Sequence, residues 1–123
     1  MKHKRIIVAR YGGPDALQVI EEDRPEPKRG EVRVRVLAAG VSLPDLMMRE
    51  GIHPETPRLP FTPGWDLVGV VDQLGAGVSE LASGDLVAAL PIRGAWRNSS
   101  ACRKANWCRC HPDWMLPRQS VSC

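Results

Sequence analysis

Short apolar segments separated by turn residues follow one another along most of this chain. The clearest pattern covers residues 31–36, where valines at every second position alternate with charged residues. An alternation of period two is typical of a β-strand with one buried face. Other apolar runs bounded by glycine, proline or charged turns predict further strands at residues 4–10, 17–20, 67–71 and 85–90.

One short helix is expected after the alternating strand has continued through residues 37–41. Ser42 can cap it, Pro44 is tolerated in its first turn, and Gly51 ends it, so it would run from residue 43 to 49 or 50. The following residues, 52–63, contain four prolines and predict a loop. Many short strands with one or two short helices predict a mainly β (α+β) domain built as a partly open barrel. They do not favour a parallel βαβ sheet.

Composition changes abruptly near Ala95. The chain of 123 residues has a net charge of +3, but five basic residues against one acid after Ala95 give the tail +4 and leave −1 for the body. All four cysteines and three of the four tryptophans also lie in the tail. The body, residues 1–95, therefore gives no electrostatic reason to expect a nucleic-acid partner, and the tail needs its own explanation.

The apolar runs also bear on location. None approaches the roughly 20 residues that span a bilayer. The basic N-terminus is followed by only four apolar residues, which is too short for a secretory signal. We therefore expect a cytoplasmic protein without a membrane partner.

Read in order, the motifs of the body resemble the N-terminal, GroES-like domain of the medium-chain dehydrogenase/reductase superfamily. The resemblance covers about the first 95 residues, and its most specific stretch is Leu-Pro-Phe-Thr-Pro-Gly-Trp-Asp-Leu-Val-Gly-Val-Val at 59–71. The other matching motifs are Tyr-Gly-Gly-Pro at 11–14, Gly-Glu-Val-Arg-Val-Arg-Val at 30–36, Ala-Gly-Val-Ser at 39–42 with Asp45, Arg-Glu-Gly at 49–51, Leu-Gly-Ala-Gly-Val at 74–78 and Gly-Asp-Leu-Val at 84–87.

Within that superfamily the chain is similar to the zinc-free quinone oxidoreductase branch. Zinc-dependent members place a cysteine ligand where Ser42 stands and a histidine near the position of Trp65. Catalytic zinc needs three protein ligands. The body has no cysteine and only two histidines, His3 and His53. The resemblance therefore implies no metal site in the body.

The resemblance also implies an activity. Members of this branch pass a hydride from NADPH to a quinone or enone, and NADPH carries the chemistry while the protein supplies position and polarity. Ser42 aligns with a polar residue close to the nicotinamide, and His53 aligns with a tyrosine that faces the substrate. His53, Asp45 and Trp65 are the pocket candidates, and no catalytic residue is assigned among them.

Each candidate also has a structural alternative. Ser42 fits equally well as a simple helix cap, and His53 as a solvated loop residue. Asp45 would be a first-turn charge favoured by the helix dipole, and Trp65 a core or pocket-wall residue.

Three explanations of residues 96–123 compete. Cys102, Cys108, Cys110 and His111 could form a zinc site, but ligands normally come in pairs two to four residues apart, and this spacing lacks the second pair. A basic tail with tryptophans could bind nucleic acid, but it has no repeat. The third explanation is a shift of the reading frame after Ala95, which would leave an aberrant, disordered tail.

The genetic code supports the third explanation. In the shifted frame each codon consists of the last base of one original codon and the first two bases of the next. Because Trp and Met have one codon each, several shifted residues are fixed: Leu and Val around Trp107, and Leu and Asp around Trp114. With permitted choices elsewhere, the shifted text contains Leu-Val-Pro-Val-Pro-Ser-Gly-Leu, which resembles what the superfamily carries at this point. The tail's patterns also agree with no structure, as unselected sequence would.

These inferences describe a truncated chain. The sequence has no Gly-x-Gly-x-x-Gly motif, so we expect the Rossmann domain, and with it NADPH binding and activity, to be absent from this chain. The resemblance implies a homodimeric parent that acts on a small-molecule quinone or enone. The alternative is a free-standing GroES-like module whose cysteine-rich tail binds zinc or a protein partner.

Overall fold

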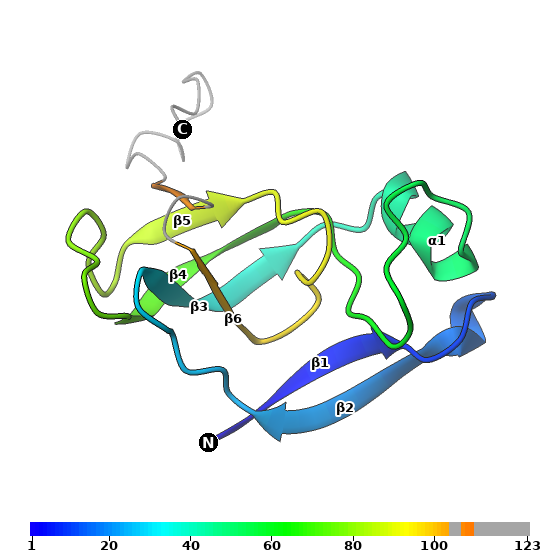
Figure 1. Cartoon of the computed structure of the whole chain (residues 1–123), viewed down its shortest axis with the longest axis horizontal. Helices are drawn as coiled ribbons and strands as arrows, with labels where there is room; N and C mark the ends of the chain where they lie inside the picture. Colours follow the sequence, from blue (N-terminus) through cyan, green and yellow to red (C-terminus); the bar gives the residue numbers. More distant parts are fainter. Residues whose placement is uncertain (104–106, 110–123) are drawn as a thin grey trace.

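Two antiparallel β-sheets and one α-helix make up the described part of the protein (Figure 1). The computed structural model describes residues 1–103 and 107–109. The smaller sheet pairs β1 (Lys2–Val8) with β2 (Leu17–Asp23) around the short 3-10 helix η1 (Pro14–Ala16). The larger sheet has the order β6-β3-β4-β5-β7, formed by Ser99–Arg103, Glu31–Ala39, Leu67–Leu74, Leu86–Ala89 and Cys108–Arg109. The helix α1 is Leu43–Glu50.

The expected mainly β, GroES-like fold is confirmed, and the sheets form no closed barrel in the described residues. Each predicted strand is present, with ends that differ by up to three residues from the predicted ones. The helix begins and ends where its cap and Gly51 predicted, and Gly51 adopts the left-handed conformation with φ of 80°. No helix within residues 1–103 and 107–109 is both long and apolar enough to cross a bilayer.

The alternating strand β3 holds the main core. Val32 and Val34 are fully buried and pack with residues of β4 and β5, among them Val71 and Val87. The charged face of β3 is not wholly solvated, however. Arg33 is buried, and its Nε donates to Asp72 Oδ1 at 2.8 Å across the β3–β4 pair. Burial of that guanidinium is compensated because a carboxylate meets it.

Gly69 on β4 lies where two backbones approach closely. A Cβ added there would stand 2.4 Å from Val34 Cγ1 and 2.5 Å from the carbonyl oxygen of Arg35. We expect Gly69→Ala to lower the free energy of unfolding by about 2 kcal/mol, because β3 and β4 must separate to make room. Urea denaturation measures this change. Gly13→Ala is the matched control and should change stability little, since its nearest neighbour would be 3.5 Å away and its φ is −77°.

The fold differs from the sequence expectation at its C-terminal end, because residues 96–103 belong to the folded domain. β6 pairs with β3 from Glu31↔Arg103 to Arg35↔Ser99, in a segment that was expected to be disordered. The backbone N–H of Ile6 also donates to the carbonyl oxygen of Trp96 at 2.9 Å. Backbone hydrogen bonds need no particular side chains, so even a segment of unsuited composition can occupy this edge. Residues 104–106 and 110–123 of the expected tail lie outside the described residues.

Candidate functional site

The start of α1 is fixed by a buried carboxylate. Asp45 has no exposed surface, and its Oδ2 accepts hydrogen bonds from both the backbone N–H and the hydroxyl of Ser42, each at 2.9 Å. The predicted capping role of Ser42 is thereby confirmed. Asp45 does more than complement the helix dipole, because its carboxylate ties down the residue that precedes the helix.

The same carboxylate reaches the loop before β4. Its second oxygen, Oδ1, accepts the backbone N–H of Gly64 at 3.1 Å. Gly64 has φ of 119°, and a Cβ there would lie 2.6 Å from the Cβ of Ala95, so only glycine fits this position. Asp45 thus holds Ser42 and the Gly64–Trp65 turn in one fixed arrangement.

Trp65 and His53 meet at the other side of this turn. Their ring centroids are 5.7 Å apart with the planes at 71°, an edge-to-face arrangement, and Trp65 also packs against Val8, Met48 and Phe61. The Nδ1 atom of His53 accepts the backbone N–H of Glu55 at 3.0 Å. We assign the ring proton of neutral His53 to Nε2 for that reason, which makes Nε2 a hydrogen-bond donor.

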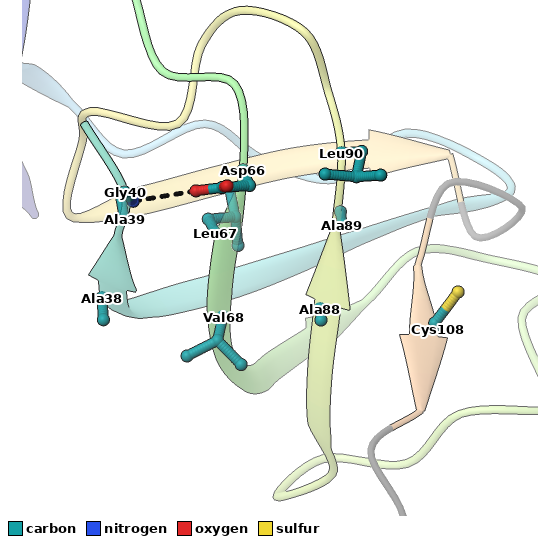
Figure 2. A pocket seen from close by; sticks show the side chains of 10 residues that line it. All are labelled: Ala38, Ala39, Gly40, Asp66, Leu67, Val68, Ala88, Ala89, Leu90 and Cys108. Carbon is teal, nitrogen blue, oxygen red and sulfur yellow. Dashed lines mark hydrogen bonds between the residues drawn. The ribbon is translucent and has the colours of Figure 1, made fainter. Parts of the chain in front are cut away.

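An apolar pocket of about 720 Å³ adjoins this arrangement (Figure 2). Two of its lining residues are close in sequence to candidate residues: Gly40 precedes Ser42 by two residues, and Asp66 follows Trp65. The residues that line it come from the ends of β3, β4 and β5 and from β7: Ala38, Ala39, Gly40, Asp66, Leu67, Val68, Ala88, Ala89, Leu90 and Cys108. Small apolar side chains leave the space, as in pockets for small organic ligands.

Two hydrogen bonds fix the backbone of Gly40, one of the lining residues. The backbone N–H of Gly40 donates to Asp66 Oδ1 at 2.9 Å, and Trp96 Nε1 donates to the carbonyl oxygen of Gly40 at 2.9 Å. A Cβ at Gly40 would meet Asp66 Oδ1 at 2.5 Å. Sequence reasoning did not single out Gly40, Asp66 or Leu90 as site residues. The adjacency of Gly40 to Ser42 and of Asp66 to Trp65 was the signal that could have found the first two.

Ser42 fits the contact with nicotinamide that the resemblance implies. Its hydroxyl proton is committed to Asp45, but the hydroxyl oxygen keeps acceptor capacity, and the residue is only partly buried. The carboxamide N–H of a nicotinamide is a suitable donor to that oxygen. Ser42 therefore caps the helix and still has an acceptor position open.

The zinc site considered as an alternative for the tail finds no support in the described residues. Within residues 1–103 and 107–109, no group of three or more His, Cys, Asp and Glu side chains could hold a metal ion. Cys102 is on β6 and Cys108 on β7, at opposite ends of the strand order, and Cys110 and His111 lie outside the described residues.

Comparison with known proteins places these features among oxidoreductases. Residues 28–119 match the alcohol dehydrogenase GroES-like domain. The chain is 36% identical over 93 residues to the human synaptic vesicle membrane protein VAT-1 homolog-like and 36% identical over 85 residues to the quinone oxidoreductase of Lama guanicoe. It is also 37% identical over 116 residues, 94% of the chain, to an alcohol dehydrogenase of Geobacillus stearothermophilus. Aligned stretches cover 76% of the chain for the human protein and 68% for the Lama guanicoe enzyme.

Solved structures of related proteins have the same fold as this chain. The crystal structure of the human VAT-1 homolog-like protein matches 92% of this chain with a TM-score of 0.86 and 31% identity. A mycobacterial protein complexed with NADPH matches 89% with a TM-score of 0.79 and 28% identity. The chain covers 37% and 34% of those two chains, and only 22% to 32% of the three sequence relatives' length.

Proposed function

Because the chain belongs to the alcohol dehydrogenase GroES-like domain family, we propose that it forms the substrate side of an NADPH-dependent oxidoreductase that reduces a quinone or enone. One observation carries the proposal. Ser42 and Trp65 are held together through Asp45 and Gly64 next to an apolar pocket, and His53 packs on Trp65. In this proposal Ser42 is the acceptor for nicotinamide and His53 the donor to a carbonyl oxygen, and the pocket, whose lining follows and precedes these segments in sequence, takes the apolar substrate.

Each residue has a distinct task in this proposal. NADPH supplies the hydride when it is bound. Ser42 accepts a hydrogen bond from the carboxamide and orients it, and Nε2–H of His53 donates to the substrate oxygen on which negative charge develops. Asp45 positions Ser42 without touching the substrate. The alanines of the pocket exclude water from the reacting carbonyl.

Several finer properties belong to the same proposal. The reaction is zinc-independent, the parent protein is a cytoplasmic homodimer, and its NADPH is held by a domain outside this chain. The NADPH complex of the mycobacterial relative supports that cofactor, and the quinone oxidoreductase of Lama guanicoe supports the substrate class. The 123-residue chain alone would then transfer no hydride.

Binding of a quinone to the chain itself tests the proposed site. Duroquinone, whose ring carbons are all substituted and resist attack by cysteine, is titrated into ¹⁵N-labelled protein. We expect shift changes at amides that line the pocket, such as those of Gly40, Leu67 and Ala89, and at those of the neighbouring Ser42 and His53, with weak affinity because one wall is missing. Changes centred on the β1–β2 sheet instead would refute this site.

We also propose that residues after Ala95 are read in a shifted frame. One buried polar atom of this segment supports it, since Trp107 Nε1 has no hydrogen-bond partner in the described part of the chain. The unpartnered Nε of Arg97 does not, because Arg5 and Arg24 of the body have the same feature. The shifted frame gives aliphatic Leu and Val around Trp107, which would fill the same core without an unpaired N–H. The family model matches the given frame as far as residue 119, so that match counts against a shift and not for it. Sequencing the gene in three frames tests this directly.

Arg97 should be a destabilising residue in this chain. Burial, and then the charge of Arg5, lower the pKa of its guanidinium, and Arg5 lies directly opposite across a β-bridge. Like charges in that position repel. We therefore expect Arg97→Ala to raise the free energy of unfolding by about 1 kcal/mol, measured by urea denaturation. Arg93→Ala, an exposed neighbour, should change nothing, and a loss of stability in Arg97→Ala would contradict the argument.

A further inference from the structure

One edge of the smaller sheet is open. Backbone hydrogen bonds from Arg24 to Met1 and from Ala9 to Ala16 continue the β1–β2 ladder at both ends. The register runs from Lys2↔Asp23 to Val8↔Leu17. These hydrogen bonds together with that register show that the even-numbered residues of β2 turn their N–H and C=O groups toward β1. The odd residues therefore point theirs away from β1, and no strand in the described residues pairs with that side. These odd residues are Leu17, Val19, Glu21 and Asp23, and of their N–H groups that of Leu17 already bonds to the carbonyl oxygen of Pro14.

The opposite edge of the same sheet is covered. On β1 the outward groups of Ile6 and Val8 bond to Trp96 and Phe61, and that of Lys4 accepts the N–H of Asn98. The outer edge of β2 is thus the place where this sheet can extend.

Charge does not protect the open edge as it does in many edge strands. Lys2 Nζ meets Asp23 Oδ1 at 2.9 Å, and Lys4 stands directly opposite Glu21 in the β1–β2 register. The acids of β2 are therefore balanced within their own protomer, so the edge does not call for a basic partner. Its centre is apolar instead, since Val19 is 67% exposed.

We propose that β2 pairs with β2 of a second copy of this chain, antiparallel about a two-fold axis at Val19. Val19 then lies opposite Val19 of the second copy, and Leu17 opposite Glu21 of the second copy. Because Ile6 is the partner of Val19 within each protomer, the four-stranded sheet carries a continuous apolar row of Ile6, Val19, Val19 and Ile6 across both copies. The contact is isologous, as closed dimers require.

Register and charge favour this pairing over its neighbours. Only registers that differ by whole pleats bring outward N–H and C=O groups together. Shifting the axis by one residue, to Ile20, would place Val19 opposite Glu21, and shifting it again would oppose Glu21 to Glu21. Shifting the axis the other way, to Gln18, would still pair Leu17 with Val19 but would oppose Glu21 to Asp15. The proposed register keeps Glu21 opposite Leu17; the acids that it does oppose, Asp23 and Asp15, each have a basic partner within their own protomer, Lys2 and Arg10. This inference is independent of the proposed oxidoreductase function.

Analytical ultracentrifugation of the full chain under reducing conditions tests it. A strand-edge contact is small, so we expect a weight-average mass near the 13.6 kDa of the monomer at low concentration, rising toward twice that value above roughly 100 µM. Val19→Pro removes an N–H that bonds to nothing inside the protomer and should abolish the rise. Val19→Lys should also abolish the rise in mass. It provides the test if the proline variant fails to fold.

The matched control is Leu43→Lys, which removes an apolar side chain of equal exposure, 68%, from α1. It should dimerise like the unchanged protein. A chain that stays monomeric throughout, or Val19 variants that dimerise normally, would overturn the proposal.

Discussion

Replacing Asp45 with alanine is expected to lower the free energy of unfolding by about 3 kcal/mol or more. The carboxylate is fully buried and accepts three hydrogen bonds, two from Ser42 and one from the backbone of Gly64. Its removal leaves buried donors unpaired and frees the start of α1 from the loop before β4. Urea denaturation of the purified chain measures the change.

Two variants show whether the hydrogen bonds are the cause. Asp45→Asn keeps the size and one acceptor oxygen, so it should cost clearly less than alanine. Asp15→Ala removes an exposed carboxylate that pairs with Arg10 at 2.7 Å, and it should cost under about 0.5 kcal/mol. Equal losses from Asp45→Ala and Asp15→Ala would show that the buried contacts contribute little.

The second large effect is expected at His53. It is measured in a longer protein, produced by translating the gene in the shifted frame after Ala95. There, His53→Phe is expected to lower kcat for NADPH-dependent quinone reduction by about 100-fold, because it removes a proton donor. The phenyl ring can keep the edge-to-face packing on Trp65, so KM should change far less. Steady-state kinetics with a quinone separate the two constants.

A conservative variant separates donation from packing. His53→Gln retains an N–H donor without an aromatic ring, so it should recover part of kcat if donation matters. If His53→Phe keeps kcat within threefold of the unchanged protein, His53 is a wall of the pocket and the proton comes from elsewhere.

The local parts of the fold could be predicted because each depends on neighbours in sequence. Alternating valines gave β3, and Ser42 with Gly51 bounded α1 to within a residue. β6 could not be predicted, because its place depends on the free edge of β3, about 65 residues away, and its own residues carry no strand pattern. The burial of Arg33 was missed for a related reason, since Asp72 compensates it from another strand.

The candidate site was predictable only in its residue list. Motif resemblance identified Ser42, Asp45, His53 and Trp65, and the structure connects them. The central part of Asp45 was not foreseen, because a contact with the backbone of Gly64 leaves no mark on residue type. The pocket was missed because alanine and glycine define it by the space that they leave.

The central proposal is that these residues form the substrate side of a quinone reductase whose NADPH is bound by residues outside the given 123. The most direct test measures NADPH oxidation with duroquinone, in the same buffer and without added zinc, for the 123-residue chain and for the protein that follows the shifted frame. We predict no turnover by the first and quinone-dependent oxidation by the second. Turnover by the 123-residue chain, or none by the longer protein, would contradict the account.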